Sequence, residues 1–596
     1  MKEGKGKTVN SKLLGLYYVQ CLFISELMIQ TVTIIAVIEN NNFIQSDIYH
    51  AVYRYFLGKF IQINYSEKGL KFMRQISNFL QLNSRNLCGL ILIFGCVLHS
   101  IAGYSFFDLT GHAFGSDDAY ISYRYAENLI HGDGLVYNLG ERVEGYSNLL
   151  YVLLVAPAFL FTGGIGVYVY SVIVNIMCAL GAYWVFHKWI CKNFSPPITT
   201  LACFLFAMSP LVWLWTASGM ETILVLLVQL VIWAKVERCA EPDSNSKDFF
   251  ILSLATVFSV LVRADGFVIP IFALFYLLLK GKYKFFLGLS GVFLFTVMLL
   301  FIWRYSYYGF WLPNTYYAKV SGPLFLRIKS AFLMLLTIIK SEGLFVYFIG
   351  VAYFWIIQIW KTYKHQLSYT EFLSFDKILF IGILSYWIYV GGDNFFERFL
   401  LILYPLGIFI LFQNIGQILP KNTFVGLGVI LTIFQLSVFI IDPRFQYTFQ
   451  KYDRWIVLGN YLASQHAGQV LAIDAAGKVP FFSGLKTIDV FGLNDSYIAH
   501  KDVSTFVVGH NTFDPLYVLS KKPDLIAGSI VGNKLNLNAG MTRRLYLKAG
   551  YTIKYLVRTN PINVEPIIVD VGGLDLAAII GVVENGYSYA VLQRTR

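Results

Sequence analysis

Long uncharged runs of apolar residues, separated by short basic loops, make up most of the chain. The run from Leu87 to Phe107 has 21 residues, enough for a helix to cross a hydrocarbon core that needs about 20. Basic residues precede this run, so the positive-inside rule places its amino end in the cytoplasm and Asp108 outside. The pattern predicts a polytopic membrane protein.

The other basic loops set the orientation of the remaining apolar runs. Residues 187–192, 235–247, 280–284 and 361–377, together with Lys421, are expected to face the cytoplasm. Threading the chain between them predicts eleven spans, at 87–107, 168–186, 198–216, 222–234, 249–262, 266–279, 285–303, 343–360, 378–391, 399–418 and 424–441. The stretches 149–162 and 323–340 fit as re-entrant or interfacial segments, and counting both as spans gives thirteen with the same ends.

Three regions follow from this threading. Residues 1–85 form an extension with an apolar run at 13–37. If this run crossed the membrane, the basic tract after it would lie outside, which contradicts the orientation of the first span. Either the run is therefore interfacial or the natural start is Met73. Residues 86–441 form the transmembrane domain, with an external loop at 108–147. Residues 442–596 are predicted to be an external soluble α/β domain, with a helix at 452–465 and strands at 470–473, 487–490, 525–530 and 578–583.

Composition excludes a soluble enzyme, because 57% of the residues are hydrophobic and only 14% are charged, against about 25% charged in ordinary soluble domains. The net charge of +12 would suggest nucleic acid in a soluble protein, but here the basic residues lie in short loops and predict cytoplasmic anchoring. All seven cysteines precede residue 240 without a C-x-x-C pair, so neither a zinc site nor a disulfide framework is expected.

Polar motifs that interrupt the apolar pattern fall almost entirely on the predicted outer side. Asp117 and Asp118 are adjacent, so their side chains on a helix diverge by about 100° and are expected to have separate roles. Asp117 shares a face with Tyr120 and Arg124, and a carboxylate there can take a proton from a sugar hydroxyl. The alternative is that Ser116 or Asp117 only caps the helix.

Four cations, Arg263, Arg304, Lys319 and Arg398, lie at predicted outer helix ends. Anchoring to lipid headgroups explains any one of them. Together they favour a pocket for a phosphate leaving group, which needs cations in surroundings of low dielectric. No glycine-rich nucleotide loop is present, and the scattered histidines predict no metal site.

The ordered set of motifs resembles the bacterial GT-C membrane glycosyltransferases that use polyprenyl phosphate carriers. The nearest likeness is to the mycobacterial terminal β-1,2-arabinofuranosyltransferases and their Gram-negative relatives. The motifs are residues 117–129, 140–148, 218–222, 263–266, 308–319 and 391–393, with 474–485, 488–495 and 509–510 in the tail. Relatives commonly have Pro, then often Glu, where this chain has Ala264 and Asp265.

The resemblance implies a GT-C-like transmembrane catalytic domain that moves a sugar, with arabinofuranose favoured, from a polyprenyl-phosphate donor to a cell-envelope glycan or glycoprotein. Asp117 or Asp118 would be the catalytic base, and the face that Asp117 shares with Arg124 favours Asp117. The expected donor-phosphate ligands are Arg124, Arg263, Arg304, Lys319 and Arg398, and the expected substrate-binding residues are Glu141, Glu144, Tyr146, Asn148, Glu221, Asn314, Tyr317 and Asp393. The expected location is the bacterial inner membrane with a periplasmic tail. No nucleic-acid partner is expected. No cofactor is assigned, and the involvement of a divalent cation is an open alternative.

Two other functions also fit a chain with many spans. A lipid-linked-sugar transporter or flippase would place polar residues in both leaflets, whereas here they gather on one side. A sensor with an external ligand-binding tail needs no such number of spans. Loss of activity on changing Asp117 or Asp118 alone would exclude the sensor.

Overall fold

The structure is a computed structural model that describes residues 85–101, 104–105, 111–112, 114–341, 374–418, 431 and 453–595, with gaps at 394, 396–397, 533 and 559–567, and parts of 351–364. A helix over Arg85–Ile101 and a two-stranded pair, β1 (Tyr104–Ser105) and β2 (Gly111–His112), come first. The helices that follow are α4 (Asp117–His131), α5 (Leu149–Val155), η1 (Ala156–Leu160), α6 (Ile165–Asn193), α7 (Pro196–Ala207), α8 (Pro210–Ala217), α9 (Thr222–Ala240), α10 (Ser246–Val262), α11 (Val268–Leu279), α12 (Tyr283–Tyr308), α13 (Asn314–Val320), α14 (Leu324–Ser341), α17 (Phe375–Val390), η2 (Arg398–Leu400) and α18 (Leu403–Ile418).

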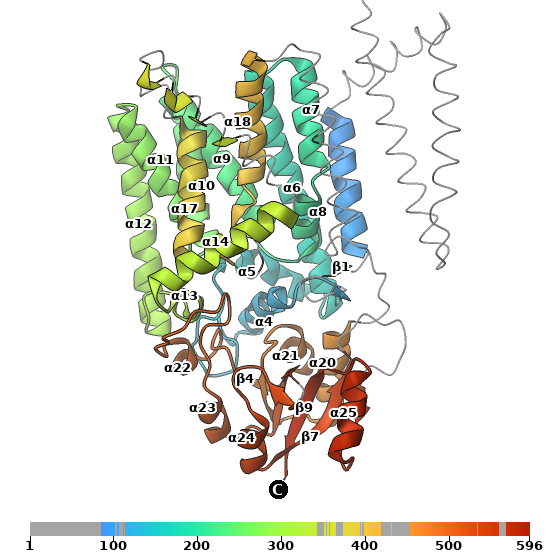
Figure 1. Ribbon diagram of the computed structural model, residues 1–596. Coiled ribbons are helices and arrows are strands. Elements are labelled where there is room, and N and C mark those ends of the chain that lie inside the picture. The colour runs from blue at the N-terminus through green and yellow to red at the C-terminus, as the bar shows by residue number, and fades with distance from the viewer. Residues whose placement is uncertain are drawn as a thin grey trace, which may run out of the picture.

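The long helices form one bundle whose two ends differ in chemistry (Figure 1). At one end the basic loops meet: Lys282 donates to the backbone oxygen of Glu241 at 3.0 Å, and Lys192 pairs with the Glu241 side chain. At the other end lie α4, α5 and α13 and, beyond them, the C-terminal domain. The bundle therefore separates the basic loops from the polar motifs, as the predicted threading requires.

Helix length does not confirm the predicted number of spans. Among the described residues, α6 and α12 are long and apolar enough to cross a membrane, and two bent pairs, α7 with α8 and α13 with α14, raise the number to four. Several predicted spans are shorter helices, such as the 12 residues of α11 and the 17 of α10. At 1.5 Å per residue, 17 residues extend for about 25 Å, less than a typical hydrocarbon core. The number eleven stays a prediction.

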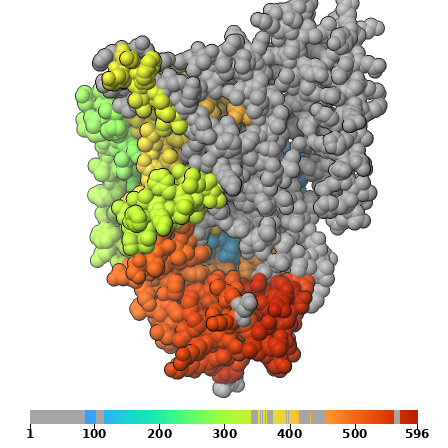
Figure 2. All heavy atoms as spheres, viewed as in Figure 1, coloured from blue at the N-terminus to red at the C-terminus, as the bar shows by residue number. Residues whose placement is uncertain are grey.

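The non-spanning predictions for 149–162 and 323–340 correspond to short or bent segments. Residues 149–160 form α5 and η1, which are seven and five residues long. Helix α14 turns by 83° from α13 and lies across the bundle rather than along it. Figure 2 shows α14 at the molecular surface next to the C-terminal domain, and the side chains of Phe325, Phe332 and Leu336 on it are exposed.

The C-terminal domain is a mixed sheet covered by helices on both faces. Its strands are β3 (Val470–Ile473), β4 (Lys486–Asp489), β5 (Leu525–Val531), β6 (Asn536–Leu537), β7 (Tyr551–Val557), β8 (Ile568–Asp570) and β9 (Tyr589–Arg594), and its helices are α20 (Arg454–Gln465), α21 (Lys478–Ser483), α22 (Ser496–Ala499), α23 (Pro515–Ser520), α24 (Arg543–Lys548) and α25 (Leu576–Glu584). The strand order is β4-β3-β5-β9-β7-β8, with β6 paired to β5. Strands β3, β4 and β5 are parallel, and the other pairs are antiparallel.

Alternation along the strands builds two apolar cores, one on each face of the sheet. Leu471 and Ile473 of β3 pack with Leu458 and Leu462 of α20. Ala472, which points to the other face, belongs to the core that α23, α24 and α25 cover. Helix α20 begins where the Asp453 carboxylate accepts hydrogen bonds from the amides of Trp455 and Ile456, so the predicted helix at 452–465 is capped by its own sequence.

One predicted strand is wrong. Residues 578–583 lie in α25, whose start is capped by the Asp575 carboxylate accepting from the Ala578 amide at 2.8 Å. The β-branched run favours a strand by propensity, but the cap and the packing of one helix face onto the sheet decide otherwise. The other predicted strands correspond to β3, β4 and β5. The predictions for residues 1–84 and for 424–441 fall outside the described residues apart from residue 431, and the prediction for 343–360 falls largely outside them.

Candidate functional site

A cavity of about 600 Å³ lies where the bundle meets the C-terminal domain. Its charged lining consists of Asp118, Glu221, Arg263, Asp265, Arg304, Lys319, Asp393 and Arg398. Leu493, Phe506 and Gly509 of the C-terminal domain complete the wall. The bundle and the tail therefore build this site together.

Helix α4 presents Asp118 to the cavity and turns Asp117 away from it. Asp118 and Ser122 are one turn apart, share a face and line the cavity. Asp118 makes no hydrogen bond or ion pair with any residue that the structure describes. Asp117 does not line the cavity, and its two carboxylate oxygens accept hydrogen bonds from the backbone amides of Gly477 at 3.0 Å and Lys478 at 2.8 Å. A carboxylate free to accept a proton is thus present at Asp118.

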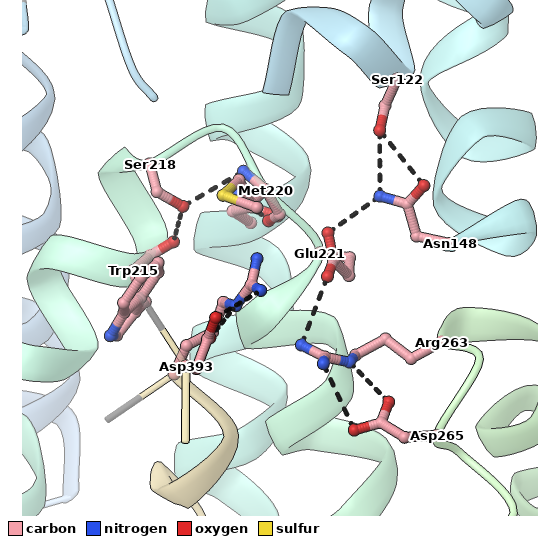
Figure 3. Close-up of polar contacts among 11 residues, drawn as sticks. Ser122, Asn148, Trp215, Ser218, Met220, Glu221, Arg263, Asp265 and Asp393 are labelled. Carbon is pink, nitrogen blue, oxygen red and sulfur yellow. Dashed lines mark hydrogen bonds and ion pairs between the residues drawn. The ribbon is translucent and has the colours of Figure 1, made fainter. Parts of the chain in front are cut away.

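A chain of polar contacts connects the cavity face of α4 to Arg263 (Figure 3). The Asn148 amide donates to Ser122 at 3.0 Å and to the Glu221 carboxylate at 2.9 Å. Glu221 lies 3.5 Å from Nη1 of Arg263. On its other edge Arg263 donates to both oxygens of Asp265, at 2.7 and 3.3 Å. The guanidinium is held by two carboxylates in one orientation while it lines the cavity.

A second guanidinium, that of Arg398, also lies near the Phe399 ring. Arg398 donates to both oxygens of Asp393, at 2.9 and 3.3 Å. The Cζ atoms of Arg263 and Arg398 lie 3.8 and 5.1 Å from the Phe399 ring centroid. Because Asp265 and Asp393 occupy the Nε and Nη2 groups of the two guanidiniums, the Nη1 side of each is the part that can meet an oxyanion.

Arg304 and Lys319 complete the cationic lining. Arg304 donates from Nε to Glu144 at 2.6 Å in a buried ion pair. Burial raises the pKa of Glu144 to about 7, and the Arg304 charge opposes that rise. Lys319 makes no hydrogen bond or ion pair within the part of the chain that the structure describes, so its ammonium group is available to a ligand.

The remaining wall of the cavity is apolar. It includes Val260 of α10 and Phe293, Val297, Leu300 and Phe301 of α12. On its other side α12 exposes Phe295, Met298 and Ile302. Charged groups and a long apolar surface thus meet in one cavity, which suits an amphiphilic ligand with a phosphate group and a hydrocarbon chain.

The structure brings most of the predicted site residues together. Those that line the cavity are Asp118, Tyr146, Asn148, Glu221, Arg263, Arg304, Lys319, Asp393 and Arg398. They come from six separate segments of the sequence, at α4, the loop before α5, the turn before α9, the α10–α11 turn, the α12–α13 region and the segment around η2.

Two predicted residues are placed against the C-terminal domain instead. Asp117, favoured as the base from the sequence, has both carboxylate oxygens occupied by backbone amides of the C-terminal domain. Arg124, predicted to bind phosphate, donates to the backbone oxygens of Tyr137, Pro480 and Leu485 at 2.8 to 2.9 Å. Asp117 and Arg124 do share a face of α4, as the spacing predicts, but that face packs against the C-terminal domain. Neither Ser116 nor Asp117 caps α4 through its side chain.

Four more predicted substrate-binding residues do not line the cavity. Glu141 pairs with Lys486 at 2.6 Å and Glu144 with Arg304. The backbone N–H of Asn314 donates to the Glu144 backbone oxygen at 3.0 Å, and the Tyr317 ring lies 4.1 Å from that of His500. These contacts join loops and domains around the cavity.

Sequence reasoning missed several lining residues. Ser122 follows from Asp118 by helical spacing, so its signal was present. Phe399 directly follows the predicted Arg398 but lies in no motif. Leu493 lies within the motif 488–495, yet its place in the wall, like that of Phe506, depends on how the tail packs against the bundle. Among the described residues, no three His, Cys, Asp or Glu side chains come together as a metal site.

Comparison with known proteins finds one matching family model and several solved structures of similar fold. A family model described as a domain of unknown function (DUF8728) matches residues 443–562. No curated protein matches the chain significantly. The structure is similar to ArnT from Cupriavidus metallidurans bound to undecaprenyl phosphate, with a TM-score of 0.52 and 11% identity over 85% of this chain and 97% of that one.

Two further solved structures are similar over much of the chain. The apo oligosaccharyltransferase of Archaeoglobus fulgidus gives a TM-score of 0.51 and 11% identity, over 76% of this chain and 70% of that one. Arabinofuranosyltransferase AftD from Mycobacteria gives 0.38 and 11%, over 86% of this chain and 40% of that one. The likeness to ArnT and the oligosaccharyltransferase shows that the chain shares their fold, with a sheet domain at its C-terminus, and it agrees with the predicted resemblance to GT-C proteins.

Proposed function

We propose that this protein is a membrane glycosyltransferase that moves a sugar from a polyprenyl-phosphate donor to a cell-envelope glycan or glycoprotein. The observation that carries the proposal is the Asp118 carboxylate, which pairs with no described residue and lies in a cavity that also has four cations and an apolar wall. A general base, an anion site and a surface for a lipid chain are the three parts that this transfer needs. The likeness of the fold to ArnT supports the same class of donor.

The donor would lie with its hydrocarbon chain along α10 and α12 and its phosphate near Lys319, Arg263 and Arg398. Asp118 takes the proton of the acceptor hydroxyl as that oxygen attacks the anomeric carbon. The bond between the anomeric carbon and the phosphate oxygen breaks, and polyprenyl phosphate leaves with the electron pair. The cations stabilise the charge that develops on the leaving phosphate.

The finer parts of the proposal rest on the sequence. Arabinofuranose is favoured as the sugar because the ordered motifs resemble arabinofuranosyltransferases. We propose the outer side of the bacterial inner membrane for the cavity and the C-terminal domain, and the basic loops at the opposite end of the bundle support this orientation. The dependence of sugar transfer on a divalent cation is tested by measuring transfer with and without a chelator.

The test is transfer of labelled arabinofuranose from its polyprenyl-phosphate donor to an arabinan oligosaccharide by purified protein in liposomes. Asp118→Asn is expected to lower kcat by roughly a hundredfold or more, and the exposed Asp133→Asn to leave it unchanged. Full activity of Asp118→Asn would remove the base assignment. Movement of the lipid-linked sugar across the bilayer without transfer to any acceptor would favour the flippase.

If the natural sugar is not arabinofuranose, the arabinofuranose donor gives no transfer in the liposome assay although the protein is active in cells. Mass spectrometry of envelope glycans and glycoproteins from a deletion strain then identifies the missing sugar. A deletion strain with unchanged glycans and glycoproteins would contradict the transferase proposal as a whole.

A further inference from the structure

The C-terminal domain forms hydrogen bonds with the start of α4 at Asp117, the residue next to the proposed base Asp118. Both oxygens of Asp117 accept backbone hydrogen bonds from that domain, from Gly477 and Lys478. The Lys478 side chain is fully buried, and its Nζ donates to the Gly115 backbone oxygen at 2.7 Å and to Asp453 at 2.6 Å. The residues before and at the start of α4 are therefore fastened to one short segment of the tail.

This contact leaves no room for a side chain at position 477. A Cβ added to Gly477 would lie 1.9 Å from the backbone oxygen of Asp117, far inside van der Waals contact. The glycine thus permits the close approach of the two backbones. The contact can be broken from either partner, at Asp117 or at Gly477.

A second point of attachment lies two turns further along the same face of α4. Arg124 donates from Nη1 to the Pro480 oxygen at 2.9 Å and from Nη2 to the Leu485 oxygen at 2.8 Å. Residues seven apart differ by only about 20° around a helix. Two attachments on one face set the rotation of α4 about its axis, and Asp118, about 100° away, then faces the cavity.

We propose that the C-terminal domain contributes to catalysis by positioning the base. Its contacts with Asp117 and Arg124 set the rotation of α4 about its axis, and this rotation orients the Asp118 carboxylate towards the acceptor. Asp117 is a positioning residue in this arrangement. The proposal gives a role to the domain that the family of unknown function matches. It rests on the proposed function for the base role of Asp118.

The experiment compares Asp117→Ala, Gly477→Ala and their double variant in the reconstituted transfer assay. Each single variant is expected to lower kcat by roughly ten- to a hundredfold, as small misplacements of a catalytic group do, with the donor KM within about twofold of wild type. The kcat of the double variant should be no lower than that of the slower single variant, because both substitutions break the same contact between Asp117 and Gly477. Asp117→Asn keeps one carbonyl acceptor and should retain more activity than Asp117→Ala.

Gly581→Ala is the matched control in the same domain, since an added Cβ there meets nothing within 4 Å. It should behave as wild type. If Gly477→Ala does not yield folded protein in detergent, Arg124→Lys breaks the second attachment while keeping the charge, and a similar loss of kcat is expected. Unchanged kcat in folded Asp117→Ala would overturn the proposal.

The pH dependence of kcat separates positioning from base catalysis. Asp117→Ala should keep the wild-type limb that reports deprotonation of the base, and Asp118→Asn should lose it. If Asp117→Ala loses the limb, Asp117 is itself the base and the positioning role is wrong. If Asp118→Asn is fully active, the proposed function fails first, whatever the Asp117 variants do.

Discussion

At the scale of single residues, the buried pair of Glu144 and Arg304 couples the charge of the cavity to pH. Glu144 is 3% exposed, and one of its carboxylate oxygens has no hydrogen-bond partner among the described residues. The pKa of about 7 lies above the usual 4.5 because burial disfavours the ionised form. Glu144 therefore contributes most to stability below pH 4.5, and that contribution declines as the pH rises towards 7.

Glu144→Gln is expected to remove a pH dependence of donor binding. When the pH falls through about 7, Glu144 gains a proton and Arg304 keeps its charge, so the cavity becomes more positive. The proposed donor is a phosphodiester, and the charge of a phosphodiester does not change in this range. The wild-type donor KM should therefore fall between pH 8 and pH 6, by roughly three- to tenfold for about 1 kcal/mol of charge interaction.

The Gln variant should show the low KM at both pH values. Donor KM is the informative quantity, because kcat also depends on the step that the proposed base carries out. A variant whose KM changes with pH as in wild type would show that Glu144 does not control the charge of the cavity.

At the scale of secondary-structure elements, the turn between α10 and α11 determines where Arg263 lies. The Ser259 hydroxyl donates to the Gly266 backbone oxygen at 2.6 Å, and the Gly266 amide donates to the Arg263 oxygen at 2.9 Å. A Cβ on Gly266 would lie 1.6 Å from the Ser259 backbone oxygen. The turn closes only with glycine at this position.

Gly266→Ala is expected to open this turn and displace Arg263. Loss of one charged hydrogen bond to the donor phosphate corresponds to roughly 1.4 kcal/mol or more, so donor KM should rise about tenfold. Gly291→Ala on α12 is the matched control, because its added Cβ meets nothing within 4 Å. A normal KM in folded Gly266→Ala would show that Arg263 does not contact the donor.

At the scale of the whole molecule, the two ends of the bundle should face opposite sides of the membrane. Cys191 is exposed at the end where the basic loops meet. The exposed Lys548 lies in α24 of the C-terminal domain, at the other end. The remaining described cysteines are buried.

Thiol labelling checks this orientation in a Lys548→Cys variant with Cys21 changed to Ser. A membrane-impermeant maleimide should label Cys at position 548 in intact spheroplasts and should reach Cys191 only after permeabilisation. The parent with Lys548 is the control. Labelling of Cys191 in intact spheroplasts would reverse the predicted topology.

The sequence by itself determined the properties that depend on local pattern. Apolar runs and basic loops predicted the helices and their two ends, because periodicity and charge act over short stretches of chain. The ordered motifs contained most of the cavity lining, including Asp118, Glu221 and Arg263. Strand prediction failed at 578–583, where β-branched residues form a helix whose capping and packing outweigh local propensity.

Only the tertiary structure decided which of two adjacent carboxylates faces the cavity. Helical geometry required Asp117 and Asp118 to differ, but it could not say which face of α4 the C-terminal domain covers. That choice depends on contacts between residues some 360 positions apart in the chain, such as Asp117 with Gly477. No pattern along the sequence encodes such a distant contact, because it arises only when two separately folded surfaces fit against each other.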